Sequence, residues 1–416
     1  MAAIAEANAP VASAPGLFQN RPFVALFIGQ TVSIIGDGFH SVALGLWVLQ
    51  TTGSATAMAT IMTVRMLVTI LLGSLAGAIV DRVDRYKVMV AVNAVRFLIT
   101  GAIAYLIYSG MHSLLPIVVL SGLLAVAGNF YGPALQASLI NIVGKEQIQQ
   151  ATSLRQVSNT LAQVVGPLLG GAVVAFTGGW AAMSIDSVTF LFGLIMTIVG
   201  GYFPSPVRNE AAGRSSIWAD MKEGLVQIRK NPIISTMVTV APLLNFFATA
   251  TFLLLPVIAV RVWQTTPTQF GAMEASFPLG FAAGAALLMA FSKKMSRRGW
   301  WIITGTFFTG LGMVLIPLMP TVTIALPVMV ATGLVNALIN VLFSVVLQSE
   351  TPPEVQGRVF GTLNSLTGIA NPLAMMLAGV LADRVSPVLL ASGAGIVVLL
   401  ISIGIIPWAR PLRSYN

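Results

Sequence analysis

Cysteine is absent from this 416-residue chain, and histidine occurs only twice, at His40 and His112. Without cysteine the protein forms no disulfide bond, binds no zinc through thiolates and has no cysteine nucleophile. Two histidines far apart in the sequence do not have the spacing of a histidine metal site. We therefore expect neither a metal nor a cofactor.

Charged residues are also scarce in this chain. They make up 8% of the chain, against about 25% in an ordinary soluble domain. Hydrophobic residues make up 56%, and the mean hydropathy is +0.89. A soluble protein of this size would need more surface charge to stay in water. The composition therefore predicts an all-α membrane protein that crosses the bilayer many times.

Charge-poor blocks long enough to cross a bilayer follow one another along nearly the whole chain. A spanning helix needs about 20 apolar residues, because the hydrocarbon is about 30 Å thick and each residue rises about 1.5 Å. The charge-free run 299–349 must hold two helices, with the break near Pro317. Twelve transmembrane helices are predicted, at Pro22–Leu49, Ser54–Val80, Lys87–Tyr108, Leu114–Ile140, Leu154–Phe176, Ala181–Phe203, Ile233–Val260, Phe270–Phe291, Trp300–Leu318, Val322–Leu347, Arg358–Ala382 and Pro387–Trp408.

These helices divide into two halves of six. Within the hydrophilic stretch between them, Ile217, Met221 and Leu225 recur at helical spacing beside charged residues. This pattern predicts an amphipathic helix on the membrane surface, although a plain linker helix fits equally well. The predicted segments are a disordered tail (1–21), an N-terminal half (22–203), a cytoplasmic linker (204–232), a C-terminal half (233–409) and a C-terminal tail (410–416).

Basic residues indicate the orientation. Nearly all of the 22 Lys and Arg fall on the side that holds both termini and the linker, and only Arg261 and Arg384 fall on the other. Basic loops stay in the cytoplasm, so both termini are predicted there, with the chain in the inner (cytoplasmic) membrane. The net charge of +9 is thus a topology signal. We expect a monomer that contacts the lipid bilayer and no nucleic acid.

Ionisable groups inside a membrane are costly, so each is a candidate for function. Asp37 lies in the middle of the first predicted helix. With Gln30, Ser33 and His40 it forms one polar face, which we expect to line a cavity. A buried carboxyl can take up and release a proton near neutral pH, so Asp37 is the first candidate for proton coupling or substrate contact. A structural carboxylate, permanently paired with an arginine, is the alternative.

Four further ionisable residues share this candidacy. Arg65 and Arg96, in the second and third predicted helices, could neutralise Asp37 or bind an anionic substrate. Arg96 could instead extend to the cytoplasmic interface. Asp186 and Glu274 begin the sixth and eighth predicted helices near the outer surface, where we expect mouth residues or a second proton site. Glu274 is the second candidate for coupling.

Amide side chains are most frequent in the second half. Hydrogen-bonding residues surrounded by Phe and Met suit a large amphipathic ligand better than a bare ion. Hydrogen bonds between helices use the same residues, so a structural role stays open for each of them. The candidate cavity amides are Asn129, Gln136, Asn245, Asn336, Asn340, Asn364 and Asn371.

The stretch Gly77–Lys87 carries a family resemblance. Its sequence, Gly-Ala-Ile-Val-Asp-Arg-Val-Asp-Arg-Tyr-Lys, resembles the signature between helices two and three of the major facilitator superfamily, which usually has Gly in place of Asp84. The resemblance implies the major facilitator fold and transport by alternating access. Shorter stretches are similar to the macrolide-efflux and enterobactin-exporter branch of that family, at 35–37, 52–54, 150–154 and 356–359.

For this signature the resemblance implies a gating role. Asp81 would approach the start of helix eleven, where exposed N–H groups carry partial positive charge. Arg82 and Arg85 could pair with acids on the same face. With Gly77 they would hold the cytoplasmic side closed and release it as the halves rock. Simple anchoring of solvated charges on the inner side is the alternative.

A second stretch, with Gly166, Pro167, Gly170 and Gly171, resembles the fifth-helix antiporter motif of drug exporters in that family. Small residues let two helices approach closely, and proline removes one backbone donor and bends the helix. The resemblance implies a close helix contact that blocks leakage in exporters. A generic small-residue packing face explains the same spacing without a direction of transport.

The sequence thus predicts a proton-coupled secondary exporter of an amphipathic small molecule such as a drug, a macrolide or a siderophore. ATP drive is not expected, because the chain has no GxxxxGK[ST] loop. A membrane enzyme would need a nucleophile–base pair or paired acids at one depth, so we predict no catalytic residues. A major facilitator importer or a lysolipid flippase is the main alternative, since helix number and gating motifs are shared.

Overall fold

The computed structural model describes residues 16–111, 113–203, 228, 231–291, 297–353 and 355–408, and its regular elements there are all helical. This confirms the all-α prediction. The predicted linker helix, apart from residue 228, and most of both tails lie outside the described residues. The elements are η3 (Leu17–Gln19), α1 (Arg21–Thr52), α2 (Ala55–Val80), α3 (Arg85–Tyr108), α4 (Leu114–Thr177), α5 (Gly179–Gly200), α7 (Pro232–Arg261), α8 (Pro267–Phe291), α9 (Arg298–Leu318), α10 (Val322–Glu350), α11 (Gln356–Ala382) and α12 (Pro387–Trp408).

Helix α4 covers two of the predicted spans. Its 64 residues would measure about 96 Å as one straight helix, roughly three times the hydrocarbon thickness. Gly144 interrupts it with φ 76° and ψ 170°, a conformation that glycine reaches without steric cost. Counting 114–143 and 145–177 separately gives the twelve predicted spans in the described chain. All eleven α-helices are long and apolar enough to cross a membrane.

Side-chain caps determine where several helices begin. Asn20, Ser54, Asp84 and Asn231 each accept a backbone N–H from the first turn of the helix that follows. Such a cap satisfies a donor that the helix itself leaves unpaired. Asp84, which departs from the family signature, therefore has a local role as the cap of α3.

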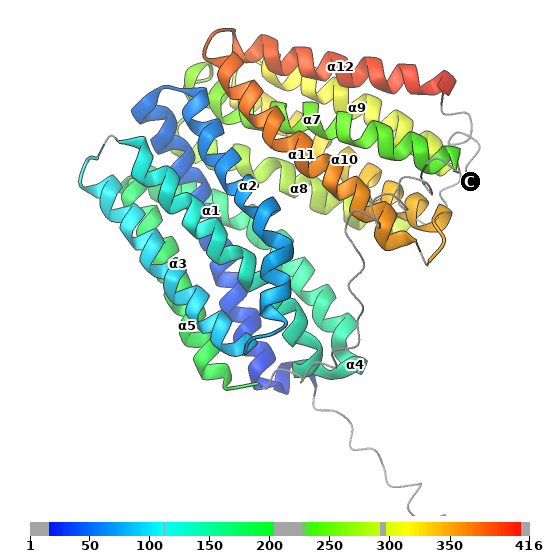
Figure 1. Ribbon diagram of the computed structural model, residues 1–416. Helices are drawn as coiled ribbons and strands as arrows, with labels where there is room; N and C mark the ends of the chain where they lie inside the picture. Colours follow the sequence, from blue (N-terminus) through cyan, green and yellow to red (C-terminus); the bar gives the residue numbers. More distant parts are fainter. Residues whose placement is uncertain are drawn as a thin grey trace, which may run out of the picture.

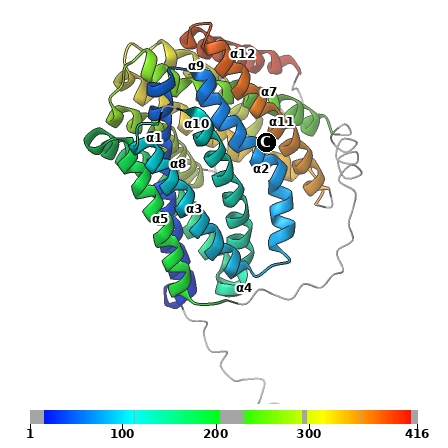
Figure 2. The same ribbon diagram turned by 60° about the vertical axis from the view of Figure 1, so that its left-hand side comes forward.

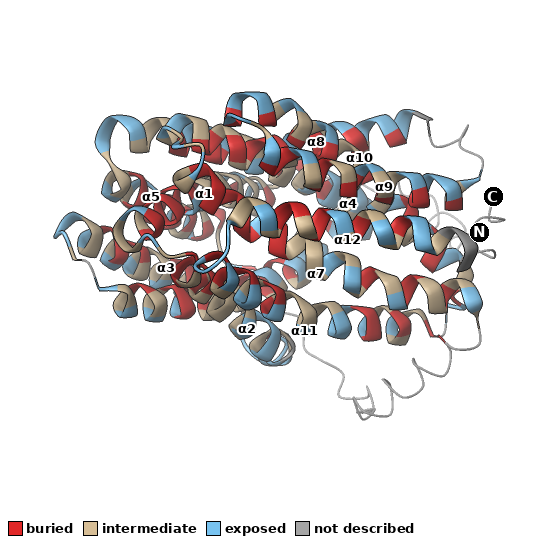
Figure 3. Ribbon diagram, turned by 90° about the horizontal axis from the view of Figure 1, so that it is seen from above, coloured by how far each residue is buried: buried red, intermediate tan, exposed pale blue. Residues whose placement is uncertain are grey.

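The helices form two bundles, α1–α5 and α7–α12 (Figure 1). The main contacts between the bundles run along two helix pairs, α4 with α8 and α2 with α11. The α2–α11 pair is also seen side by side in the rotated view (Figure 2). Buried residues lie where helices face one another, and exposed residues lie along the outer helix faces (Figure 3).

Large apolar side chains cover much of that outer surface. Leu98, Tyr105 and Phe176 are 65%, 68% and 87% exposed. A water-soluble monomer rarely exposes extensive apolar patches. Lipid contact explains this surface, in agreement with a multi-pass membrane protein.

The two bundles meet at one end and diverge at the other. We call the end at which α5 ends and α7 begins the linker side, and the opposite end the far side. On the far side, Gly379 of α11 lies so close to α2 that an added Cβ would overlap that of Ala59. On the linker side, no described residue of another helix has a heavy atom within 4 Å of a Cβ built at Gly77 or Gly357. The structure is therefore closed on the far side and open on the linker side, which is the predicted cytoplasmic side.

Candidate functional site

A cavity of about 580 Å³ lies within the C-terminal bundle. Helices α7 to α12 all contribute to its wall. The structure brings together in this wall the five amides predicted in the second half of the sequence, which are Asn245, Asn336, Asn340, Asn364 and Asn371.

The remainder of the cavity wall is mainly aromatic and aliphatic. Phe252 and Phe277 lie edge to face, with ring centroids 4.6 Å apart. Phe281, Phe343 and Phe360 line other parts of the wall. Within the described chain, no charged side chain lines the cavity. Such a wall can bind a large amphipathic ligand by apolar burial and orient it through the amides.

Two of the amides are held in place but keep polar atoms for a ligand. The Asn340 Nδ2 donates to the main-chain oxygen of Asn336 at 2.9 Å and to its Oδ1 at 2.7 Å. The Asn371 Oδ1 accepts the Thr249 hydroxyl at 3.2 Å. Among the described residues, the Asn340 Oδ1 and the Asn371 Nδ2 have no protein partner. One atom of each amide therefore fixes its orientation, and the other is available for binding.

A charged cluster lies in the N-terminal bundle instead. Asp37 of α1 forms an ion pair with Arg96 of α3, with 3.1 Å between Oδ1 and Nη2. The Arg96 guanidinium also lies 3.9 Å from the centre of the Phe190 ring in α5, a cation–π distance. Arg96 therefore points across the bundle and does not extend to the membrane interface. Arg65 forms no ion pair with any residue that the structure describes.

His40 and Asp186 form a second, enclosed pair. Asp186 has no exposed surface, His40 is 3% exposed, and Nδ1 lies 3.1 Å from Oδ2. Gly36 makes room for this contact, because a Cβ there would lie 2.6 Å from the Asp186 Oδ1. The prediction that Asp186 is a mouth residue is therefore wrong, since α5 turns its carboxyl toward α1 inside the bundle. Its role as a second proton site stays a prediction.

The polar residues of α1 do not all face one cavity. Ser33 and His40 are buried, and the Ser33 hydroxyl donates to the main-chain oxygen of Thr189 in α5 at 3.3 Å. Asp37 lies on a more open face, with its side chain 48% exposed. Gln30 is half-buried, and its Oε1 has no partner among the described residues. The predicted single polar face is therefore wrong, because α5 covers one edge of it.

Glu274 links the two bundles. The Ser41 hydroxyl of α1 donates to the Glu274 Oε2 of α8 at 3.3 Å. The carboxyl thus faces the N-terminal bundle and does not line the cavity. Its position in the first half of α8 is on the far side, and proton coupling by Glu274 stays a prediction.

The two amides predicted in the N-terminal half have structural partners. The Asn129 Nδ2 donates to the main-chain oxygen of Val68 at 3.3 Å, which joins α4 to α2. The Gln136 Oε1 accepts a hydrogen bond from Nη1 of Arg155 at 3.1 Å. Neither amide lines the cavity of the C-terminal bundle. Their geometry agrees with the structural alternative left open for every amide.

The glycine motif of the second segment of α4 packs against two neighbours at once. Gly166 and Gly170 face α1, and a Cβ at Gly166 would lie 2.7 Å from a main-chain oxygen there. Gly171 faces α8 of the other bundle, where its Cβ would lie 2.5 Å from the main-chain oxygen of Pro267. Pro167 lies between these contacts inside the helix. The motif thus forms a backbone-to-backbone contact between the bundles, and its relation to export stays a prediction.

The signature residues lie on the open linker side. Arg85 donates to Oδ1 of Asp81 at 3.3 Å and to the main-chain oxygen of Ala137 at 2.9 Å. Arg82 is exposed, and Gly77 meets no neighbouring helix among the residues that the structure describes. Asp81 makes no bond to a described residue at the start of α11 in this open state. The gating role of these residues stays a prediction.

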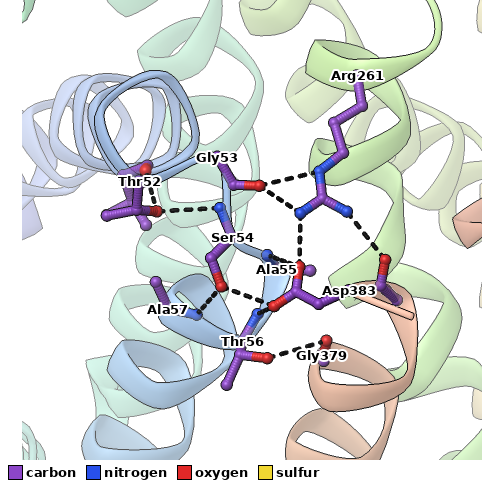
Figure 4. Close-up of polar contacts among 11 residues, drawn as sticks. Thr52, Gly53, Ser54, Ala55, Thr56, Ala57, Arg261, Gly379 and Asp383 are labelled. Carbon is purple, nitrogen blue, oxygen red and sulfur yellow. Dashed lines mark hydrogen bonds and ion pairs between the residues drawn. The ribbon is translucent and has the colours of Figure 1, made fainter. Parts of the chain in front are cut away.

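Sequence reasoning missed Arg261 and Asp383. Figure 4 shows them joined to Gly53–Thr56, at the turn between α1 and α2. A signal for this contact was present, because the heptapeptide Gly379–Val385 repeats the Gly, Asp, Arg and Val of Gly77–Val83. In the sequence, Arg261 stands out only as an exception to the distribution of basic residues.

Comparison with known sequences identifies relatives along most of the chain. The sequence profile of the Major Facilitator Superfamily matches residues 26–375 and 240–414. Macrolide efflux protein A of Streptococcus pyogenes is 24% identical over 370 residues, covering 87% of this chain and 90% of the relative. The multidrug efflux pump Tap of Mycolicibacterium fortuitum is 25% identical over 371 residues, covering 87% and 89%. The enterobactin exporter EntS of Escherichia coli is 27% identical over 411 residues, covering 96% and 95%.

Solved structures share the fold at low sequence identity. A bacterial homologue of the human lysosomal transporter Spinster, described as inward-facing and unoccupied, matches with a TM-score of 0.69 and 13% identity over 95% of this chain and 96% of its own. A bacterial homologue of the iron transporter ferroportin, described as inward-facing, matches with a TM-score of 0.70 and 14% identity over 94% and 99%. These matches show that the fold is shared along nearly the whole chain.

Proposed function

Since the chain belongs to the major facilitator superfamily, we propose that it is a proton-coupled exporter of an amphipathic small molecule and works by alternating access. The single observation that carries this proposal is the C-terminal cavity, where amides and phenylalanines surround a space of about 580 Å³. Ligand pockets for drug-sized molecules have this size and this mixture of apolar walls and few polar groups. The names of the relatives supply drugs, macrolides and siderophores as candidates.

Asp37 is the proposed proton acceptor. Its ion pair with Arg96 spans α1 and α3, and protonation of the carboxylate would remove the attraction that holds the two groups at 3.1 Å. Arg96 would then keep only its contact with the Phe190 ring. Helix α1 also contacts α7 and α8 of the C-terminal bundle. A change in the Asp37–Arg96 ion pair can therefore alter the relative orientation of the two bundles. The enclosed His40–Asp186 pair is the proposed second proton site.

Export is proposed over import on two grounds. The relatives that cover most of this chain are named as efflux or export proteins. The glycine motif that resembles the exporter motif also forms the tight contact of α4 with α8.

The distribution of basic residues supports an inner membrane location with both termini in the cytoplasm. We propose that the monomer is the transporting unit, because the cavity lies within one chain.

Inverted membrane vesicles with an imposed pH gradient test this function. An exported compound accumulates in such vesicles only while the gradient lasts, and its addition causes a proton flux. The compounds to compare are a macrolide, a catecholate siderophore and a lysolipid. Transport of the lysolipid alone would favour a flippase, and gradient-driven uptake by intact cells would favour an importer. No proton flux with any compound would contradict proton coupling.

The variant Asp37→Asn separates the proton site from the cavity. It should lose gradient-driven transport but keep ligand binding, because Asp37 does not line the cavity. Arg384→Gln is the matched control, since it also removes one charge, from an exposed residue. Full gradient-driven transport by Asp37→Asn would exclude Asp37 as the proton acceptor.

A further inference from the structure

We propose that Asp383 and Arg261 of the C-terminal bundle lock the far side closed by binding the start of α2 in the N-terminal bundle, and that this lock opens in each transport cycle. We call the group formed by Asp383, Arg261 and Gly53–Thr56 the far-side lock. The proposal rests on the alternating access proposed above. It concerns residues outside both the cavity and the charged cluster.

The carboxylate of Asp383 caps a helix of the other bundle. Its Oδ2 accepts the Ser54 hydroxyl at 2.7 Å and the Thr56 N–H at 3.0 Å. Its Oδ1 accepts the Ala55 N–H at 2.8 Å. The N–H groups at a helix start lack partners within the helix and carry partial positive charge, so a carboxylate is favourable there. The end of α11 therefore pairs the Ala55 and Thr56 N–H groups, which the Ser54 cap of the Ala57 N–H leaves open.

Arg261 binds both Asp383 and the same turn (Figure 4). Its guanidinium donates to Oδ1 of Asp383 at 2.5 Å, to the main-chain oxygen of Gly53 at 3.1 Å and to that of Ala382 at 2.9 Å. One side chain thus joins the ends of α7 and α11 to the α1–α2 turn. Gly53 has a φ of 62°, which glycine adopts without strain, so the sequence itself favours the turn that presents this oxygen.

The Asp383 carboxyl is ionised at physiological pH, because its pKa is lowered. Burial alone raises the pKa of the Asp383 carboxyl, but its hydrogen bonds, first from Thr56 and then from Ser54, outweigh this effect. The net pKa lies below the ordinary value of 3.8. Movement of the bundles, and not protonation, is therefore what opens the lock.

Packing makes the lock depend on contact between the bundles. The Thr56 hydroxyl donates to the main-chain oxygen of Gly379 at 3.3 Å. A Cβ built at Gly379 would lie 3.0 Å from the main-chain oxygen of Ala55. At this distance the backbones of α2 and α11 touch directly. Any rotation that separates the two helices on the far side breaks the bonds of Asp383 and Arg261 to α2 together.

Two similar heptapeptides stand at the ends of α11 and α2, one on the far side and one on the linker side. Gly379–Val385 and Gly77–Val83 share Gly, Asp, Arg and Val in register. The end of α11 lies beside the start of α2, so the two helices are antiparallel. Asp383 binds the start of α2, whereas Asp81 bonds to Arg85 of its own bundle. Within the part of the chain that the structure describes, the far-side copy is the one whose aspartate bonds to the other bundle.

Labelling of an introduced cysteine tests the lock directly. The chain has no cysteine, so Thr249→Cys in the cavity wall reports access without background. A membrane-impermeant maleimide added outside intact cells should react slowly while the far side is closed. Asp383→Asn or Arg261→Gln should raise this rate about tenfold, because losing a charge-assisted hydrogen bond shifts an equilibrium by about that factor. Arg384→Gln should leave the rate unchanged.

Labelling from both faces separates a lock from a merely structural role. In inverted vesicles the same two variants should label more slowly, because the population moves away from the linker-side-open state. Faster labelling from both faces would indicate loosened structure and overturn the proposal, as would unchanged rates from outside. Should either variant not reach the membrane, Ser54→Ala removes one donor at 2.7 Å and should raise the outside rate less. Labelling needs neither substrate nor a pH gradient, so this outcome is independent of the transport assay.

Discussion

Replacing Gly171 by alanine should loosen the contact between α4 and α8. The new Cβ would lie 2.5 Å from the main-chain oxygen of Pro267 and 3.0 Å from the Cα of Gly271. Both neighbours are backbone atoms of a helix, so they cannot rotate away as a side chain would. The bundles must separate at this point to admit the methyl group.

The cost follows from that geometry. An extra methyl group in a close-packed contact costs about 1–3 kcal/mol. Alanine in place of glycine inside a helix gains about 0.5–1 kcal/mol where there is room. At Gly171 the difference between the overpacking cost and the helix gain is about 0–2.5 kcal/mol, with a central value of about 1.3 kcal/mol. Gly132, in the first segment of the same helix, has no heavy atom of another described helix within 4 Å of an added Cβ, so only the gain applies there.

Thermal unfolding of the purified protein and outside labelling of Thr249→Cys measure the two consequences. Gly171→Ala should lower Tm by a few degrees, since 1 kcal/mol corresponds to about 2–4 °C. It should also speed labelling about tenfold for each 1.4 kcal/mol lost from the far-side-closed state. Gly132→Ala should raise Tm slightly and leave labelling unchanged. Equal Tm shifts and equal labelling rates in the two variants would refute the role assigned to this contact.

Three other expectations follow from the site. Asn340→Leu should weaken binding of the transported compound about tenfold in a radioligand assay, because it removes an amide oriented toward the cavity. Tm without ligand should change little. Phe190→Leu removes a cation–π contact of about 0.5–2 kcal/mol with Arg96, and should lower gradient-driven transport in vesicles while leaving cavity binding intact. The pKa of Asp383 is lowered from 3.8, so its stabilising bonds persist above that value and are lost only as pH falls through the lowered pKa. Outside labelling of Thr249→Cys should therefore be flat from about pH 5 to pH 8.

Helix number and order could be predicted because hydrocarbon leaves a chain little choice. Every backbone group must bond within its own helix, so the length of an apolar run gives the number of crossings. The connection near Gly144 was harder to predict. Lys145 and Glu146 are typical of a loop, yet the chain is helical on both sides of the glycine, whose positive φ alone separates two spans.

The candidate site was predictable where only the helix face matters. Polar residues on one face of an apolar helix avoid lipid, and the five amides of the second half therefore meet in one cavity. Asp186 was misplaced because its distance from the helix boundary gives its depth but not the neighbour it faces. Asp383 and Arg261 were missed because each is an ordinary charge at a helix end, and their partners at Gly53–Thr56 are remote in the sequence.

The charged cluster and the cavity lie in different bundles and share no residue among those described. If protons drive transport as proposed, a proton and the substrate do not compete for one carboxylate, and the coupling must pass through packing. Helix α1 carries Asp37 and also bonds to Glu274 of α8 through Ser41. The same α8 contributes Phe277 to the cavity wall. A shift of α1 on protonation would therefore move that wall, whereas the far-side lock lies on the separate contact of α2 with α11.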